Sequence, residues 1–226
     1  AIVDQTINQN MTLISGIPPW VQMYFEKIIE KSGKQIGDVF KNFSLFIYGG
    51  VSFKPYKKIF DELIGRKVNS IEVYPASEGF FAFQDQIDND SMLLILNNHI
   101  YYEFIKVKDL LIGKKNYICL SDVKVGENYA LVISTSSGLW RYDIGDTVQF
   151  TQLEPYRIIV TGRIKHFISA FGEHVIAKEV ETTIKEVSSK LNLKVREFTV
   201  APQVSPKAGL PFHEWFIEFD EINDNL

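Results

Sequence analysis

Ser77 and Glu78 are the side chains of this sequence best placed to do chemistry. They follow an apolar, β-branched run at 68–74 that predicts a buried strand. Pro75 and Gly79 are expected to break this strand and to leave both side chains at its C-terminal end, where α/β folds bind ligands. A hydroxyl that can meet a phosphate oxygen, beside a carboxylate that can hold Mg²⁺, indicates a nucleotide site. Such segments are common, so the pattern needs further elements to become specific.

A second candidate is the segment 139–146, where a strand is expected to end and the chain to turn at Gly145. An ionised Asp only accepts hydrogen bonds, so a carboxylate at this turn can receive both hydroxyls of a ribose. The alternative is that Asp143 and Asp146 cap the backbone of their own turn. We favour capping for Asp143 and ribose binding for Asp146, the latter because of a resemblance that includes the third segment and is described below.

A third candidate is the segment 161–175, which contains a fixed cation, Arg163, after Gly162. A guanidinium suits ribose or phosphate oxygens, and a Gly-Arg pair at a domain boundary fits a hinge that reorients a lid. For His166 a surface or interface position is favoured over chemistry. For Glu103, which lies in an expected strand, we favour a solvent-facing position or a structural Lys or Arg partner.

The composition excludes several classes of protein. The net charge of −4 creates no field that would attract nucleic acid or an anionic membrane. The single cysteine, Cys119, excludes a disulfide framework and is expected to be a buried small hydrophobe. No apolar stretch approaches the roughly 20 residues of a membrane span, no signal peptide is visible, and no residue set has zinc-site spacing. We therefore expect a cytoplasmic protein without nucleic-acid or membrane partners.

The expected elements form a mixed α/β architecture, because strand follows helix twice in the first part of the chain. A helix should run from Pro18 to Gly33 and another over 54–64, with strands at 44–48 and 68–74. Short apolar runs split by turn residues then predict antiparallel strands of a meander or of a small, barrel-like part. These runs are 80–83, 92–96, 100–105, 117–120, 129–134, 147–150 and 157–161.

A domain boundary is expected near Gly162. Residues 1–162 would be part of a large domain, and 163–226 would begin a small α+β lid with a helix at 175–191 and strands at 195–201 and 214–219. Both ends of the sequence look cut, which suggests a fragment of a longer protein.

Taken together, these segments resemble the acyl-adenylate-forming, luciferase-like superfamily. The motifs YPASEG at 74–79, YDIGD at 142–146 and GRIKHFISAFGE at 162–173 occur in the order of its later core motifs. The closer similarity is to the auxin-responsive Gretchen Hagen family of acyl-acid amido synthetases, in its bacterial branch. Three more segments fit that family, LISGIPPW at 13–20, GGVSFKPY at 49–56 and FHEWFIEF at 212–219.

The resemblance implies an ATP and Mg²⁺ site. Tyr74, Ala76 and Ser77 would line its adenine and α-phosphate side, and Glu78 would hold Mg²⁺. Trp20, Phe80 and Phe83 would border the acyl pocket, although a plain core position is favoured for each of these aromatic residues.

The same resemblance assigns the second and third segments. Asp146 would bind the ribose hydroxyls, and Arg163 would reach the ribose or phosphate from the hinge. Plant members carry an Asp-Lys-Thr stretch in the lid, whose Lys can meet the α-phosphate, where this chain has Glu173-His174-Val175. His174 could replace that Lys only in part, because its charge at neutral pH depends on its surroundings.

The implied activity is ATP-dependent adenylation of a carboxylic acid, followed by transfer of the acyl group to an amino acid or another amine. The superfamily's Ser/Thr/Gly-rich phosphate loop is absent from residues 1–73, so we expect the 226-residue chain by itself to be inactive and to bind ATP weakly or not at all. Two alternatives stay open, transfer of the acyl group to coenzyme A and a non-catalytic module that binds an acyl acid or a nucleotide.

Overall fold

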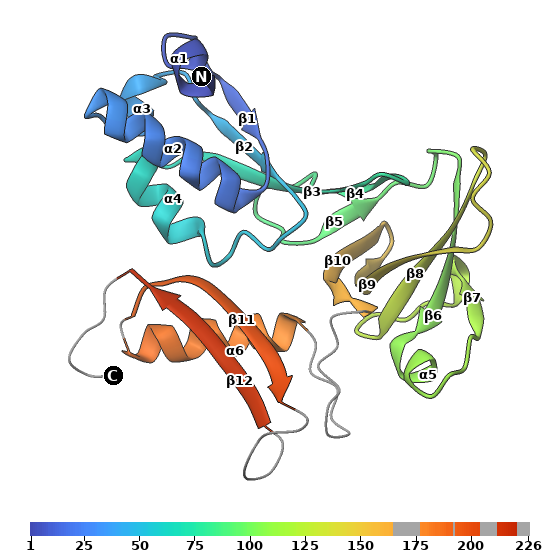
Figure 1. The fold of residues 1–226 in the computed structure, drawn as a ribbon. Coiled ribbons are helices and arrows are strands. Elements are labelled where there is room, and N and C mark those ends of the chain that lie inside the picture. Colours follow the sequence, from blue (N-terminus) through green and yellow to red (C-terminus); the bar gives the residue numbers. More distant parts are fainter. Residues whose placement is uncertain (165–176, 192, 204–211, 221–226) are drawn as a thin grey trace. The chain divides into compact units, whose positions relative to one another are not determined.

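The computed structural model describes residues 1–164, 177–191, 193–203 and 212–220 (Figure 1). The chain divides into two compact units. The first contains Ala1–Tyr101 and Phe150–Ile159, and the second contains Tyr102–Gln149 and the described residues from Val160 onward. Each unit is described separately below. The domain boundary expected at Arg163 stays a prediction.

The first unit is built on a mixed sheet with the order β1-β2-β3-β4-β5-β10. Strands β1 (Leu13–Ser15), β2 (Leu45–Tyr48) and β3 (Asn69–Ala76) are parallel to one another. Strands β4 (Gly79–Phe83) and β5 (Met92–Leu94) follow in antiparallel orientation, and the start of β10 (Tyr156–Arg163) pairs with β5. The expected α/β class with a mixed sheet is therefore confirmed.

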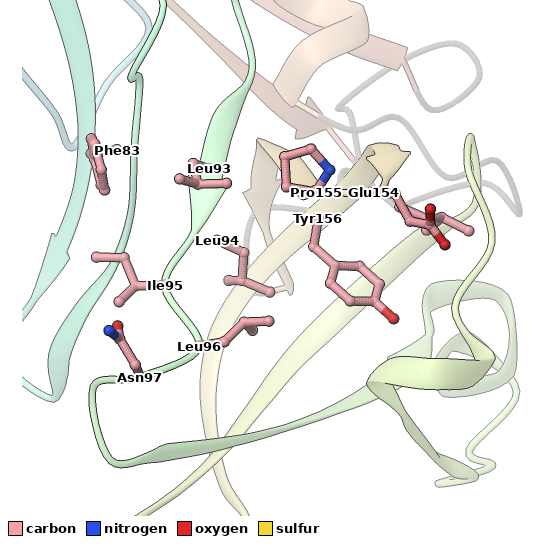
Figure 2. Close-up of a pocket in the computed structure, with 10 residues that line it drawn as sticks. Phe83, Leu93, Leu94, Ile95, Leu96, Asn97, Glu154, Pro155 and Tyr156 are labelled. Carbon is pink, nitrogen blue, oxygen red and sulfur yellow. The ribbon is translucent and has the colours of Figure 1, made fainter.

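A mainly apolar pocket of about 660 Å³ lies where the turn at 153–156 faces the segment 93–97. Figure 2 shows Pro155 and Tyr156 across from Leu94 and Leu96. Phe83 also lines the pocket, and Glu154 is its only charged lining residue. No set of polar side chains converges on it, so its lining offers packing rather than chemistry.

The helices of the first unit cover the parallel strands. Helix α2 begins with Pro18 and Pro19 and ends at Gly33, whose left-handed backbone lets its N–H bond to the Ile29 carbonyl, as the sequence predicts. Helix α4 begins at Lys57 rather than at the expected Lys54, because the residue before Pro55 is disfavoured in helical geometry. The unit contains four helices, α1 (Ile2–Thr6), α2 (Pro18–Ser32), α3 (Ile36–Val39) and α4 (Lys57–Ile64).

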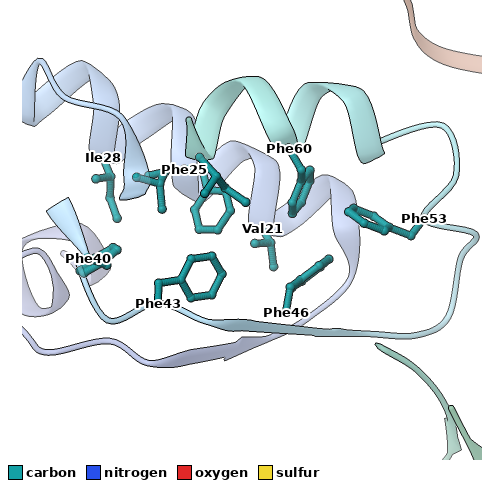
Figure 3. Packing of buried hydrophobic residues seen from close by; sticks show 10 residues of the cluster. Val21, Phe25, Ile28, Phe40, Phe43, Phe46, Phe53 and Phe60 are labelled. Atoms are coloured by element: carbon teal, nitrogen blue, oxygen red, sulfur yellow. The ribbon is translucent and has the colours of Figure 1, made fainter. Parts of the chain in front are cut away.

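The core of this unit is an aromatic cluster between α2, α4 and β2 (Figure 3). The Phe60 ring lies 5.5 Å from Phe25, 5.0 Å from Phe46 and 4.9 Å from Phe53, measured between ring centroids. Each such aromatic pair adds about 0.5–1.5 kcal/mol to what burial alone contributes. The cluster therefore fixes the helices against the parallel strands and the loop that follows β2.

The second unit contains the expected antiparallel strands, in the order β10-β9-β8-β6-β7. Within the described residues this order is linear. The connecting helices α5 (Val107–Leu111) and η1 (Leu120–Asp122) are short. The strands are β6 (Ile100–Lys106), β7 (Tyr117–Cys119), β8 (Asn128–Thr135) and β9 (Tyr142–Leu153).

The chain continues with α6 (Ala177–Leu191), β11 (Val195–Gln203) and β12 (Phe212–Phe219). The two strands pair in antiparallel fashion from Val195↔Phe219 to Gln203↔Phe212, so the helix and both strands expected here are confirmed. His166, Glu173 and His174 lie outside the described residues. None of the helices in the described part of the chain combines the length and the apolar character that a membrane span requires.

Candidate functional site

Ser77 and Glu78 form the two-residue turn of the hairpin between β3 and β4, with Ala76 paired to Gly79. The expected break at Pro75 is wrong, because β3 continues to Ala76. A register shift between Tyr74 and Pro75 accommodates the proline inside the strand. Ser77 is exposed and Glu78 is half-buried. The hairpin therefore holds a hydroxyl and a carboxylate next to each other at its tip.

The loop after β2 passes very close to this hairpin. A Cβ atom on Gly49 would lie 2.5 Å from the carbonyl oxygen of Val73 and 3.2 Å from Cδ of Pro75, so only glycine fits there. The N–H of Gly16, after β1, donates to the carbonyl oxygen of Ile47 at 3.0 Å. The segments that follow β1 and β2 therefore gather at the C-terminal edge of the parallel strands, beside the Ser77–Glu78 hairpin.

Aromatic side chains at this edge differ in exposure. Tyr74 is buried, and its ring packs edge-to-face on Phe81 with a 5.0 Å centroid separation. Trp20 is 71% exposed and Phe80 is 44% exposed, so the plain core position favoured for these two residues is wrong. Trp20 lies in the first turn of α2, which follows β1, and Phe80 lies in β4 directly after the Ser77–Glu78 turn.

Tyr48 is a residue at this edge that sequence reasoning missed. It is the last residue of β2, directly before Gly49. Burial, followed by the negative charges of Glu72 and Asp90, raises the pKa of the Tyr48 phenol. The hydroxyl is therefore protonated at all physiological pH values. The signal that could have found it is a tyrosine that ends an apolar strand ahead of a Gly-Gly pair.

In the second unit, Asp146 lies on a bulge of β9. The turn expected at Gly145 is wrong, because β9 runs from Tyr142 through Gly145 to Leu153. Its pairing with β8 shifts between Val132↔Asp143 and Ala130↔Thr147, so β9 carries extra residues around Gly145, whose φ is +84°. The Asp143 carboxylate accepts the Gly145 N–H at 2.9 Å, which confirms the capping role expected for Asp143.

The bulge brings Asp146 to Arg163. The Nε–H of Arg163, at the end of β10, donates to Oδ1 of Asp146 at 2.6 Å. The Asp146 residue is 7% exposed, whereas the Arg163 side chain is 58% exposed. A buried carboxylate paired with a mostly exposed guanidinium can bind a ligand that carries neighbouring hydroxyl and phosphate groups. The carboxylate accepts hydrogen bonds from the hydroxyls, and the guanidinium donates hydrogen bonds to the phosphate oxygens.

A second polar contact lies next to this pair and was also missed in the sequence. Thr161 Oγ1 donates to Oδ1 of Asn128 at 2.6 Å and lies 2.9 Å from Oγ1 of Thr147. Thr147 follows Asp146 and Thr161 precedes Gly162-Arg163, so these buried hydroxyls fix the two strands beside the ion pair.

Of the two positions expected for Glu103, solvent-facing or paired with a structural Lys or Arg, the structure shows the second, with Arg141 as the partner. Its carboxylate accepts three hydrogen bonds of 3.0–3.2 Å from Arg141. Its cross-strand neighbour Cys119 is exposed, so the expected burial of the thiol is wrong. Cys119 ends β7, the outermost strand, where the sheet covers it on one side only.

The predicted residues thus form two groups. Tyr74, Ala76, Ser77 and Glu78 share one hairpin of the first unit, and Asp146 and Arg163 pair in the second unit. The assignment of His174 stays a prediction.

Comparison with known proteins identifies a relationship. Residues 93–163, which carry both Asp146 and Arg163, match the GH3 family central domain. The chain is related to the GH3 family. It is 38% identical over 154 residues to "Probable indole-3-acetic acid-amido synthetase GH3.11" of Oryza sativa subsp. japonica, a match that covers 61% of this chain and 26% of the rice protein.

A second GH3 relative matches over more of the chain. "Jasmonoyl--L-amino acid synthetase JAR6" of Nicotiana attenuata is 32% identical over 205 residues, which cover 84% of this chain and 35% of that protein. Both of these relatives are plant proteins, so the assignment to the bacterial branch of the GH3 family stays a prediction.

Solved structures confirm the fold. A structure of "GH3.15 acyl acid amido synthetase" superposes with a TM-score of 0.74 at 14% identity, covering 97% of this chain and 49% of that one. A 2-hydroxyisobutyryl-CoA ligase in its postadenylation state gives a TM-score of 0.69 at 15% identity, with 97% and 46% coverage. The chain therefore has the fold of adenylate-forming enzymes and spans about a quarter to a half of the length of these GH3 relatives and ligases.

Proposed function

We propose that the full-length protein is an ATP-dependent acyl-acid amido synthetase. The observation that carries this proposal is the contact between Asp146 and Arg163 inside the region that matches the GH3 central domain. The names of the two relatives describe an indole-3-acetic acid-amido synthetase and a jasmonoyl-L-amino acid synthetase. A carboxylate paired with a hinge cation provides the acceptor and donor that a nucleotide's ribose and phosphate require.

In the first half-reaction, an oxygen of the substrate carboxylate would attack the α-phosphorus of ATP. The bond between the α-phosphorus and its bridging oxygen breaks, which gives acyl-AMP and pyrophosphate. Because two anions meet, the site must neutralise negative charge. The Arg163 guanidinium would donate to a phosphate oxygen, and the exposed Ser77 hydroxyl could donate to another.

Glu78 is the residue that would hold Mg²⁺. Mg²⁺ in nucleotide sites is usually bound by one or two carboxylates together with substrate phosphates. A half-buried carboxylate at a hairpin tip fits that demand, since it leaves room for the phosphates. When bound, the ion would neutralise charge on the phosphate oxygens during adenylation.

The remaining assignments concern the nucleoside and the acyl group. Asp146 would accept the ribose hydroxyls, and Ala76, the last residue of β3 before the hairpin turn, would line the α-phosphate side. The exposed Trp20 and Phe80 would border the apolar part of the acyl acid. In the second half-reaction, an amino acid or another amine would attack the acyl carbonyl and AMP would leave.

Pyrophosphate exchange into ATP tests the proposed function. The full-length protein is incubated with Mg²⁺, ATP, labelled pyrophosphate and a panel of carboxylic acids, and the best acid is then combined with amino acids or with coenzyme A. We expect exchange that depends on one class of acid, and an amide as the final product. A folded protein that supports no exchange with any acid would contradict adenylation, and a thioester product would redirect the assignment to acyl-CoA ligation.

Substituting Asp146 with Asn should raise the KM for ATP by about 10- to 100-fold, the equivalent of losing a charge-assisted hydrogen bond of about 1.5–3 kcal/mol. The KM for the acyl acid should change little, because the ribose lies away from the acyl group. The matched control is Asp143→Asn, three residues earlier, whose amide oxygen can still cap Gly145. If ATP dependence is the same in Asp146→Asn and wild type, Asp146 is only the structural partner of Arg163.

A further inference from the structure

Arg141 has an unusual backbone conformation close to the proposed ribose site. Its φ is +44°, in the left-handed region that non-glycine residues seldom adopt. It directly precedes β9 and lies five residues before Asp146. Such a strained conformation persists only where the surroundings over-determine it. The contacts that hold Arg141 in this conformation therefore also fix the start of β9.

Three strands hold Arg141 in place. Its backbone N–H donates to Oγ of Ser134 on β8 at 3.0 Å. Its guanidinium bonds both carboxylate oxygens of Glu103 on β6, with Nε at 3.2 and 3.0 Å and Nη2 at 3.0 Å. The same guanidinium lies 4.7 Å from the ring centroid of Tyr117 on β7. The side chain of Glu103 is 8% exposed and that of Arg141 is 62% exposed.

These contacts fix the point at which β9 enters the sheet. Tyr142 pairs with Ile133 and Asp143 with Val132, and the ladder then shifts at the bulge before Thr147 pairs with Ala130. A ladder that contains a bulge does not by itself fix how many residues fill the bulge, and a slip of one residue would turn every following side chain to the other face. Asp146 would then leave Arg163.

The bulge is thus held on both sides by polar contacts. After it, the Thr147 and Thr161 hydroxyls lock β9 to β10. Before it, the bidentate bonds between Glu103 and Arg141 lock β9 to β6, two strands away. Replacing a buried ion pair by an apolar pair of similar size often leaves the stability of a protein unchanged. A bidentate contact between a guanidinium and a carboxylate, in contrast, forms in only one geometry and therefore specifies the register.

We propose that Glu103 and Arg141 are positioning residues for Asp146. The pair fixes the register of β9, so that the bulge presents the Asp146 carboxylate to the ribose of ATP. Neither residue contacts the nucleotide. The expected effect on ATP binding rests on the proposed function of the full-length protein. The expected effect on the register of β9 does not.

The test uses the full-length protein with Glu103→Gln and Arg141→Lys, each of which keeps the size of the side chain but weakens the fork. The control is Glu127→Gln, which removes an exposed ion pair with Lys108 in the same unit. A small misplacement of a binding group can cost up to about 100-fold, so we expect the KM for ATP to rise about 10-fold in both variants. The KM for the acyl acid should stay within about twofold of wild type, as should every constant of the control.

Hydrogen–deuterium exchange supplies a second readout that does not need activity. Amides of residues 142–147 should exchange about 10-fold faster in both variants, while amides of β11 and β12 keep their wild-type rates. If Glu103→Gln does not fold, Arg141→Lys carries the test, because it keeps a cation beside the buried carboxylate.

The outcomes separate the two proposals. A wild-type protein without pyrophosphate exchange would contradict adenylation, and deuterium exchange at 142–147 would then decide the positioning role alone. An unchanged KM for ATP with unchanged exchange at 142–147 would overturn the positioning role. A fall in kcat and thermal stability with an unchanged KM for ATP would also overturn it, because that is the result of a merely structural pair.

Discussion

Replacement of Glu78 by Gln in the full-length protein is expected to reduce Mg²⁺-dependent adenylation by about 10²- to 10³-fold, which corresponds to about 3–4 kcal/mol of lost transition-state stabilisation. The neutral amide keeps the size of the side chain but removes the negative charge that would hold the metal ion. The measurement is the rate of pyrophosphate exchange as a function of Mg²⁺ concentration. The loss should persist at saturating ATP, since it concerns the chemical step.

The substitution should leave folding almost unchanged. Glu78 lies in a two-residue hairpin turn and is half-buried, and substitutions at such positions usually change stability by no more than about 0.5 kcal/mol. Glu154→Gln is a matched control, because Glu154 is an exposed carboxylate in another hairpin turn of the same unit. Wild-type exchange rates in Glu78→Gln would remove Glu78 from the metal site, and equal losses in both variants would show a general charge effect.

Periodicity and turn chemistry were enough to predict most elements. Helix α2 follows from two prolines, a repeating apolar face and Gly33, all of which are local signals. The short apolar runs after residue 79 became strands because alternation and turn residues bound each of them. Local signals also located both motifs that carry the proposed site, at 74–79 and 142–146.

The errors have a common physical cause. The sequence predicts strand ends at Pro75 and Gly145, yet both residues lie inside strands, because pairing with a neighbouring strand can absorb an irregular residue as a bulge. Whether a turn signal becomes a turn or a bulge depends on a partner that is distant in the sequence. The exposure of Cys119 likewise follows from its place at the end of an outer strand, which its apolar neighbours do not reveal.

Ion pairs were the least predictable part. Glu103 and Arg141 are 38 residues apart in the sequence, and Asp85 and Arg157 are 72 apart. Charged residues are frequent, so sequence alone offers each of them many partners. Only the strand order β6-β8-β9 and the pairing of β5 with β10 select the pairs that form.

The Asp85–Arg157 pair supports the second large effect that we expect. Arg157 is 3% exposed, and its two Nη atoms donate to the two carboxylate oxygens of Asp85 at 2.7 and 2.9 Å. Asp85→Asn should lower the free energy of unfolding by about 3–5 kcal/mol, because it leaves a buried guanidinium without its counter-charge. The control is Asp90→Asn, whose exposed pair with Lys54 should contribute no more than about 1 kcal/mol.

The same pair should make stability depend on acid. Hydrogen bonds from Arg157 lower the pKa of Asp85 in the folded state, so below the ordinary Asp value of about 3.9 the unfolded chain binds the proton more readily. The stabilisation is thus complete at neutral pH and is lost as the pH falls from about 4 through the folded pKa.

Denaturant unfolding at pH 7 and across this acid range measures both effects. In Asp85→Asn the free energy of unfolding should fall less steeply with decreasing pH than in the wild type. An equal slope in both proteins would mean that other carboxylates cause the loss of stability in acid. Because Arg157 and Arg163 lie on the same strand, loss of this contact with the segment between β4 and β5 should also increase amide exchange along β10.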